Sequence, residues 1–390
     1  MTGLKRKMLL PYILITSMLF LVASLACSTL SNPEGWSGGV LVGESIVIGS
    51  MDGQVLSLNV DTGEHNWEPA LVRVDDKNKN RRAIYGTPLV QDNVIFVTSY
   101  DGKVHAFSMI DGKLLETEPV TDEFVGGVSY YENRLFFGSS DGVMYGYDVE
   151  IMDQTVMMKK AWEYKANDSI WSTPVISSGL LFFTSLDHFV YALDPSDGSF
   201  VWKMETGAAL VSDPVVDGDN LYVGSFDTNF YAININSGKE KWRFTDSSNW
   251  YWGSALLSGD TIYVPSLEGK LYALNVQTGS KQWETELVGP VVGTPAIVSD
   301  MIVFGSRDGQ IRVAELSSGM ILASCDIGEK IESPIISVDN AVYFSARDHS
   351  VRSLLIKQNG NPDEKWDSPY FSEKAKDEED PTPNDWSPSC

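Results

Sequence analysis

The sequence predicts an all-β chain that folds as an eight-bladed β-propeller of four-stranded antiparallel blades, and three observations lead to that prediction. One turn phrase, Gly-Ser-x-Asp-Gly in its fullest form, occurs eight times. Each repeat contains four short runs rich in β-branched and aromatic residues, separated by Gly, Asp, Ser and Pro turns. No segment after residue 36 has a sustained helical period. The acidic residues of the turn phrase, 40 to 49 residues apart, are Asp52, Asp101, Asp141, Asp187, Asp227, Glu268, Asp308 and Asp348.

The repeat at residues 172–205 shows how one unit is built. Its four runs are residues 173–176, 180–185, 189–194 and 200–204, with a turn after each of the first three. A sheet of four short strands cannot bury both of its faces alone, so radial stacking of eight such sheets is expected. We expect the first inner strand at about residues 37–42 and the last outer strand near residues 365–368.

A tryptophan at a fixed offset from a glycine turn is the second signature of the repeat. Trp202 follows Gly198 and Trp242 follows Gly238, each by four residues. Burying an aromatic side chain of this size removes roughly 150–250 Å² from water, so we interpret these side chains as structural contacts between neighbouring blades. The predicted docking tryptophans are Trp67, Trp162, Trp202, Trp242, Trp283 and Trp366.

These repeated elements (the turn phrase, an Ala-x-Asp element, a Thr-Gly turn and the tryptophan) resemble those of the PQQ-like, or quinoprotein-type, eight-bladed propellers. The resemblance covers about residues 36–368 and is closest in type to the BamB-like lipoproteins. It implies a propeller that supports an outer-membrane β-barrel assembly machine. The fold hosts both redox enzymes and binding scaffolds, so the resemblance is more specific for fold than for function.

The N-terminal segment has the pattern of an export signal. Lys5-Arg6-Lys7 precedes an apolar stretch from residue 8 to 25, and Cys27 follows Ala26. This order is typical of a secretory signal, and the cysteine predicts a lipoprotein with lipid on Cys27. An ordinary signal peptide or an uncleaved anchor is the alternative.

The expected domains are a signal peptide at 1–26, a short tether at 27–35, the propeller at 36–368 and an acidic disordered tail at 369–390. The mature protein is expected to be exported and lipid-anchored to the cell membrane or outer membrane, facing away from the cytoplasm.

Charge and cysteine content limit the partners. The formal net charge is −24, which argues against nucleic acid because phosphate binding needs clustered Lys and Arg. Only three cysteines occur, so a disulfide framework is not expected, and Cys325 is interpreted as a small buried residue. We expect a monomeric propeller with other envelope proteins as partners.

No catalytic residue, cofactor or metal site is predicted. The chain lacks the adjacent cysteines of quinoprotein dehydrogenases and the Cys-x-x-Cys-His motif of haem attachment, and its four histidines lack metal-ligand spacing. We therefore interpret the protein as a non-catalytic protein-interaction scaffold, with envelope or outer-membrane protein assembly as the implied role. The alternatives are a propeller that binds a quinone or a sugar over Trp171 and Trp252, and a sensory ectodomain.

The residues just before each inner strand are expected to ring the central channel. They are Ser37, Tyr85, Val125, Trp171, Val211, Trp252, Val292 and Ile331. Exposed aromatic residues are typical of partner surfaces, and the alternative is that these side chains plug the channel. The predicted partner-binding residues are Tyr85, Trp171, Trp250, Tyr251 and Trp252, together with the loop bases Lys77, Lys79, Arg81 and Arg82.

Overall fold

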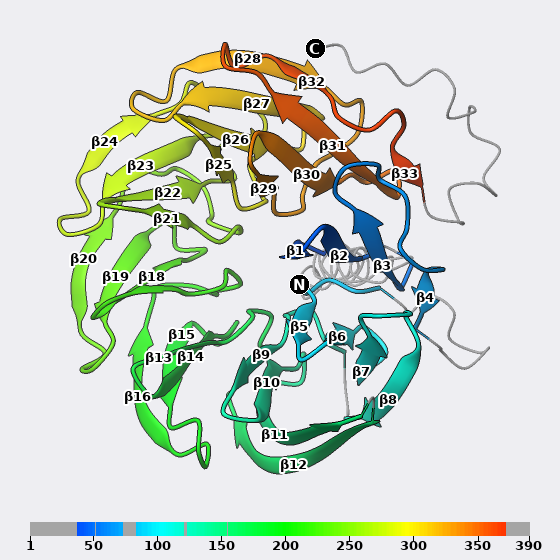
Figure 1. Cartoon of the computed structure of the whole chain (residues 1–390). Coiled ribbons are helices and arrows are strands. Elements are labelled where there is room, and N and C mark those ends of the chain that lie inside the picture. Colours follow the sequence, from blue (N-terminus) through cyan, green and yellow to red (C-terminus); the bar gives the residue numbers. More distant parts are fainter. Residues whose placement is uncertain (1–36, 51, 73–82, 121–122, 154, 372–390) are drawn as a thin grey trace, which may run out of the picture. The chain divides into compact units, whose positions relative to one another are not determined.

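The computed structural model describes residues 37–371, apart from 51, 73–82, 121–122 and 154. These residues lie within one compact unit and form eight antiparallel sheets, with no helix in the described part of the chain. Figure 1 shows the sheets arranged as blades around a common centre. The prediction of an eight-bladed β-propeller is confirmed.

Each blade is built from consecutive strands, innermost first. Blade 1 contains β1 (Gly39–Val42), β2 (Ser45–Gly49), β3 (Gln54–Asn59) and β4 (Ala70–Leu71), and blade 2 contains β5 (Leu89–Gln91), β6 (Val94–Ser99), β7 (Lys103–Ser108) and β8 (Leu114–Pro119). Blade 3 contains β9 (Ser129–Tyr131), β10 (Arg134–Gly138), β11 (Val143–Met152) and β12 (Thr155–Lys165), and blade 4 contains β13 (Val175–Ser177), β14 (Leu180–Thr184), β15 (Phe189–Leu193) and β16 (Phe200–Glu205). Blade 5 contains β17 (Val215–Asp217), β18 (Asn220–Gly224), β19 (Phe230–Asn234) and β20 (Glu240–Phe244), and blade 6 contains β21 (Leu256–Ser258), β22 (Thr261–Pro265), β23 (Leu271–Asn275) and β24 (Lys281–Glu284). Blade 7 contains β25 (Ala296–Val298), β26 (Met301–Gly305), β27 (Gln310–Glu315) and β28 (Ile321–Asp326), and blade 8 contains β29 (Ile336–Val338), β30 (Ala341–Ser345), β31 (Ser350–Ile356), β32 (Pro362–Glu364) and β33 (Tyr370–Phe371).

The outer edge of blade 8 departs from the expected strand at residues 365–368. Two short strands, β32 and β33, pair with different parts of β31 instead. Residues 365–369, including Pro369, lie between them, and a proline has no N–H to give to a ladder. The outer edge of this blade is therefore divided.

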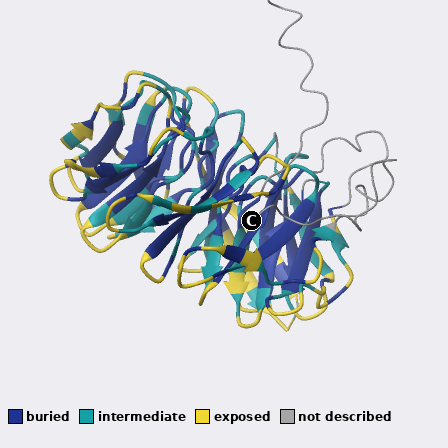
Figure 2. Cartoon of the chain, turned by 90° about the horizontal axis from the view of Figure 1, so that it is seen from above, coloured by how far each residue is buried: buried dark blue, intermediate teal, exposed yellow. Residues whose placement is uncertain are grey.

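The hydrophobic core lies between the blades. Figure 2 shows buried residues on the strands and exposed residues mainly in the connecting loops. One cluster of buried side chains joins blades 4 and 5 and includes Phe182, Trp202 and Tyr231. Because each sheet packs against both of its neighbours, both faces of every blade are covered.

Six tryptophans connect successive blades by the same geometry. Each indole N–H donates to a backbone carbonyl of the next blade, as Trp202 does to Ile235 at 2.7 Å. The indole also packs against a turn glycine of that blade, so that a Cβ on Gly238 would lie 2.7 Å from Trp202. Glycine is required there both by this contact and by its φ of +66°. The other five pairs are Trp67–Met109, Trp162–Pro195, Trp242–Val276, Trp283–Leu316 and Trp366–Val60, at 3.0–3.1 Å.

Blades 2 and 7 have another residue at the tryptophan position. Ala192 of β15 lies opposite Trp202, whereas Ala106 lies opposite Glu116 in blade 2 and Val313 lies opposite Ala323 in blade 7. In blade 7 the larger side chain of this facing pair is therefore Val313 of β27, and the smaller is Ala323 of the outer strand β28. At blade 2, the lengthened β11–β12 hairpin contributes Val149 and Val156 to the interface core. The insertion at residues 150–160 thus extends a hairpin that packs against the blade lacking a docking tryptophan.

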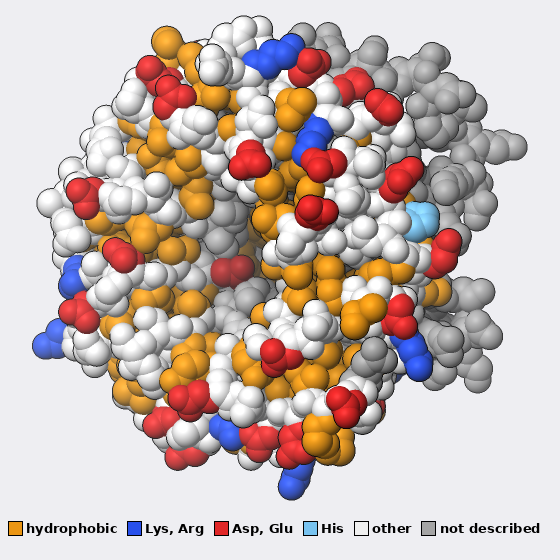
Figure 3. Space-filling model, viewed as in Figure 1, with side chains coloured by type: hydrophobic (Ala, Val, Ile, Leu, Met, Phe, Trp, Pro, Cys, Tyr) orange, Lys and Arg blue, Asp and Glu red, His pale blue; other side chains and the backbone are white. Residues whose placement is uncertain are grey.

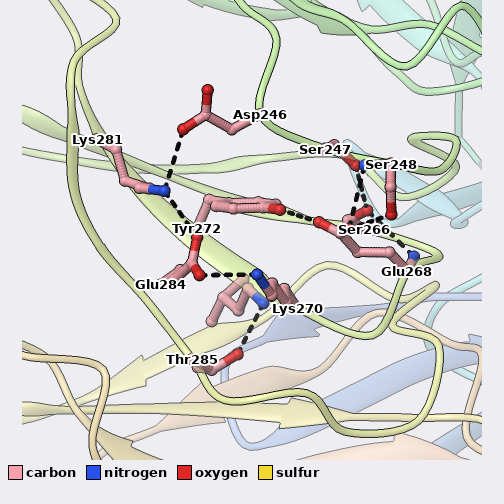
Figure 4. Close-up of polar contacts among 11 residues, drawn as sticks. Asp246, Ser247, Ser248, Ser266, Glu268, Lys270, Tyr272, Lys281, Glu284 and Thr285 are labelled. Atoms are coloured by element: carbon pink, nitrogen blue, oxygen red, sulfur yellow. Dashed lines mark hydrogen bonds and ion pairs between the residues drawn. The ribbon is translucent and has the colours of Figure 1, made fainter.

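The acidic residues of the turn phrase are used within the fold. Tyr191 donates to Asp187 at 2.5 Å and Tyr231 donates to Asp227 at 2.6 Å. Figure 4 shows the equivalent contact in blade 6, where the Tyr272 hydroxyl and the backbone N–H of Ser248 both donate to Glu268. The turn is thereby tied to the loop that leads into the same blade.

The ring closes where blade 8 meets blade 1. Trp366 and Tyr343 both donate to the carbonyl of Val60, at 3.0 and 2.9 Å. Lys365 pairs with Asp61 at 3.0 Å, and a hydrophobic cluster spans the two blades. We call this set of contacts the seam, and among the described residues it contains side-chain contacts but no strand pairing between the two blades.

Two further observations concern the ends and the cysteines. Cys325 in β28 is buried, as expected, but it is also disulfide-bonded, which the sequence reading did not anticipate. Within the described residues, no helix has the length and hydropathy needed to cross a membrane. The signal peptide, Cys27, the tether and most of the acidic tail lie outside the described residues.

Candidate binding site at the channel mouth

One face of the ring is formed by the loops that lead into the blades and by the turns that carry the acidic residues. The two sets are hydrogen-bonded: the N–H of Leu186 donates to Ser169 at 2.9 Å and that of Leu267 donates to Trp250 at 3.0 Å. We call this the channel-mouth face. It brings residues of different blades together around the central axis.

An aromatic stack lies on this face between blades 5 and 6. Trp250 is 46% exposed, and its ring stacks on Phe226 with centroids 4.6 Å apart and planes at 12°. Phe226 also stacks with Trp252 at 5.6 Å. The sequence reading did not include Phe226, although its place in the turn phrase of blade 5, beside the leading loop of blade 6, was a usable signal.

Tyr251 does not belong to this surface. It has no exposed area and packs between blades against Phe230, with ring centroids 5.7 Å apart. A Cβ on Gly224 would lie 2.2 Å from the Cβ of Tyr251. Its neighbours in the chain, Trp250 and Trp252, instead both stack with Phe226. The assignment of Tyr251 to partner binding is corrected to a packing role.

The other predicted partner-binding residues separate into two groups. Tyr85, Trp171 and Trp252 line a cavity at the centre of the ring. The Tyr85 ring also meets the edge of Tyr100, with centroids 5.6 Å apart. The four loop bases Lys77, Lys79, Arg81 and Arg82 lie outside the described residues.

The cavity has a volume of about 130 Å³, and all eight blades contribute to its wall. Figure 3 shows a hollow at the centre of the ring with hydrophobic and acidic side chains around it. In blades 2 to 8 the rim position lies four residues before the inner strand, as Tyr85, Trp171 and Trp252 do.

The expected rim needs two corrections. Blade 8 places Glu332 at the rim position, whereas Ile331 is fully buried one residue earlier. Ser37 is also buried, and its hydroxyl donates to Gly86 and accepts the N–H of Gly49. In blade 8 the rim position holds Glu332 in place of the aromatic residue or valine found in blades 2 to 7, and the residue before Ser37 lies outside the described residues.

The two carboxylates of the cavity wall differ in their partners. The Glu332 side chain, 3% exposed, forms ion pairs with Arg307 at 2.6 Å and with Arg347 at 2.7 Å. Asp213 accepts the backbone N–H of Thr173 at 2.7 Å, and its own N–H donates to the Ser254 hydroxyl at 3.1 Å. No cation is among the described groups that interact with Asp213.

Burial raises the pKa of Asp213 to about 6, and the hydrogen bonds from Thr173 and Ser254 oppose that rise without cancelling it. Asp213 keeps some accessible surface because it faces the channel, but protein surrounds the carboxylate on its other sides. Limited water and the lack of a cationic partner both disfavour the charged form. Among the described residues, no group of three or more His, Cys, Asp or Glu side chains is placed to hold a metal ion.

Comparison with known proteins identifies the family. A family model described as outer membrane protein assembly factor BamB, of the PQQ-like repeat class, matches residues 51–170, 158–250 and 246–322. The chain belongs to this family. The BamB family assignment agrees with the resemblance carried by the repeated turn phrase and tryptophan.

Relatives in the BamB family are distant. The BamB of Taylorella asinigenitalis is 24% identical over 170 residues, which is 41% of each chain, and that of Legionella pneumophila is 23% identical over 111 residues, or 28% of each chain. The chain thus spans less than half the length of these curated relatives.

Solved structures share the fold with this BamB-family chain. The BamB crystal structure from Moraxella catarrhalis has a TM-score of 0.69 at 18% identity, covering 83% of this chain and 94% of that one. A computationally designed protein, Ika8, has a TM-score of 0.71 at 15% identity, covering 84% and 98%.

Proposed function

We propose that this protein is a non-catalytic, exported lipoprotein that acts as a protein-interaction scaffold in outer-membrane protein assembly. The observation that carries the proposal is the BamB family match across residues 51–322. Its relatives are named as assembly factors, which supports a scaffold rather than an enzyme. The proposed anchor is lipid on Cys27.

The proposed partner surface is the aromatic stack of Phe226, Trp250 and Trp252 on the channel-mouth face. Trp250 offers an exposed aromatic ring, and the stacking of that ring on Phe226 restricts its movement. Aromatic side chains supported in this way lose little conformational entropy on binding and tend to dominate interface energies. The loop bases Lys77, Lys79, Arg81 and Arg82 are proposed to steer an acidic partner to this face.

Affinity capture from gently solubilised membranes tests the proposal. We expect outer-membrane β-barrel assembly proteins to be captured by the wild type, and Trp250→Ala to reduce their recovery without lowering thermal stability. Phe200→Ala is the matched control, because Phe200 is 51% exposed on the outer strand of blade 4. Equal capture by the wild type and Trp250→Ala would contradict the proposed surface, and capture without assembly proteins would contradict the proposed role.

The loop bases have a kinetic test. Neutralising Lys77, Lys79, Arg81 and Arg82 should slow association with the captured partner at low salt and have little effect at high salt, because salt screens steering. Stopped-flow or surface-binding kinetics would measure both conditions. An equal loss of rate at high salt would show that these residues do not act by long-range attraction.

The anchor has its own test. Mass spectrometry of the mature protein should find residues 1–26 absent and a lipid on Cys27. Recovery of an intact N-terminus from membranes would support an uncleaved anchor instead.

A further inference from the structure

The central cavity contains a charge that breaks the symmetry of the repeat. The position two residues before the inner strand is Thr87, Gly127, Thr173, Asp213, Ser254, Thr294 and Pro334 in blades 2 to 8. Asp213 is the one charged residue in this series. The blade pattern tolerates a small neutral side chain here, so the carboxylate is not required to form the fold.

The carboxylate of Asp213 is held in place but not neutralised. The N–H of Thr173 fixes one oxygen at 2.7 Å, and no cation is among its described interactions. Glu332 on the same wall has two arginine partners. The cavity therefore contains one carboxylate neutralised by the protein's own arginines and one that is not.

The remaining wall suits an organic cation. Tyr85, Trp171 and Trp252 come from three different blades and line the same cavity as Asp213. Aromatic faces attract ammonium groups through their quadrupoles, and a nearby carboxylate adds a direct charge interaction. The described lining contains no Lys, Arg or His that would favour an anion.

The size of the cavity limits the ligand. Its volume of about 130 Å³ is slightly below that of an engineered apolar cavity of about 150 Å³ that holds benzene. A group of that size matches a short alkylammonium. The raised pKa of Asp213 is consistent with a charge that lacks its counter-ion.

We propose that the central cavity is a binding site for an alkylammonium group, with Asp213 as the counter-ion and Tyr85, Trp171 and Trp252 as the aromatic wall. This inference does not depend on the proposed scaffold role. The ammonium group has two sources of the same chemistry: a small free amine or the lysine side chain of a bound protein.

Isothermal titration of the full-length protein with n-butylammonium tests the site, and tryptophan fluorescence gives a second readout because two indoles line the cavity. Binding of n-butylammonium should be at least ten times tighter than that of 1-butanol, its neutral counterpart. Asp213→Asn should weaken n-butylammonium binding at least tenfold. Asp217→Asn, at an exposed acid of the same blade, should change it less than twofold.

Thermal melts of the variants verify folding. Asp213→Asn removes an unneutralised buried charge, so its melting temperature should equal or exceed that of the wild type. Equal affinities for n-butylammonium and 1-butanol, or unchanged binding by a folded Asp213→Asn protein, would overturn the proposal. So would equal competition by K⁺ at the same concentration, since that indicates a generic monovalent cation site.

A peptide arm distinguishes the sources. A Gly-Lys-Gly peptide with blocked ends is compared with the same peptide acetylated on the lysine Nζ. Binding of the unacetylated peptide at least as tight as that of n-butylammonium, abolished by acetylation, assigns the site to a partner's lysine. Binding of n-butylammonium alone supports a small free amine.

Discussion

At the scale of single residues, Asp213 and Glu332 show how the same functional group takes different roles on one wall. Two arginines neutralise Glu332, whereas Asp213 relies on hydrogen bonds from Thr173 and Ser254. Asp101 is a third carboxylate, with a different set of partners. Burial acts to raise its pKa, but hydrogen bonds from His105, Lys103 and Ser99 outweigh that effect and hold the pKa near 2.

Asp213 should make stability depend on pH in a defined direction. Its folded-state pKa of about 6 exceeds the unfolded value near 3.9, so the folded state binds the proton more tightly. The stabilisation from protonation is present at low pH and is lost as pH rises from about 4 to 6. A pKa shift of this size corresponds to a change of roughly 2–3 kcal/mol in the free energy of unfolding.

The test of this prediction is a pair of urea unfolding curves at pH 5 and pH 7.5 for the wild type and Asp213→Asn. The variant should gain stability relative to the wild type as pH rises. The difference between the two proteins isolates this residue from other titrating groups. A difference that stays constant between the two pH values would show that Asp213 titrates normally.

The scale of single residues is also where sequence reasoning was least reliable. The aromatic run at residues 249–252 was interpreted as one surface patch, but Tyr251 is buried between blades and Trp250 is exposed. The rim residue of blade 8 was misplaced by one position because Glu332 stands where blades 2 to 7 have an aromatic residue or valine. Asp213 was not singled out, since its lack of a cationic partner depends on side chains that come from other blades.

At the scale of strands and blades, the sequence was far more informative. The turn phrase and the tryptophan offset recur because each blade must meet its neighbour in the same geometry, so periodicity alone predicts the sheets. Periodicity could not predict how blades 2 and 7 pack against their neighbours with Glu116 and Ala323 at the tryptophan position. The answer requires the facing residues of β27 and the extension of the β11–β12 hairpin.

The docking tryptophans should contribute to stability and not to partner binding. Trp202 is 8% exposed and its N–H is bonded to Ile235, so Trp202→Ala should cost about 3–5 kcal/mol through lost burial and the cavity left behind. Chemical denaturation measures the cost, and Trp202→Phe, which keeps an aromatic ring, should cost less. An unchanged free energy of unfolding with loss of partner capture would contradict a structural role.

At the scale of the whole molecule, the ring depends on a seam that none of the described strands crosses. Blades 8 and 1 are joined by Trp366, Tyr343, Lys365 and a hydrophobic cluster. Every other neighbouring pair of blades is also joined by continuous chain, which limits how far the two can separate. The seam is therefore the place where local opening should need the least free energy.

Trp366→Ala should make the seam open more readily than the interfaces between the other blades. We expect faster amide hydrogen exchange in blades 8 and 1, measured by mass spectrometry, with little change in blades 4 and 5. Trp202→Ala is the matched comparison, because it removes the same kind of contact between covalently connected blades. Faster exchange spread evenly around the ring in Trp366→Ala would argue against a weak seam.

The order of strands within the blades also has a mechanical consequence. The described chain starts on β1, the innermost strand of blade 1, and ends on β33, at the outer edge of blade 8. Tension between these two ends acts directly across the seam, where the described contacts that resist it are made by side chains. A single-molecule pulling trace should therefore begin with a low-force extension as the two end blades part. Larger steps should follow as individual blades unravel, each releasing about forty residues of chain.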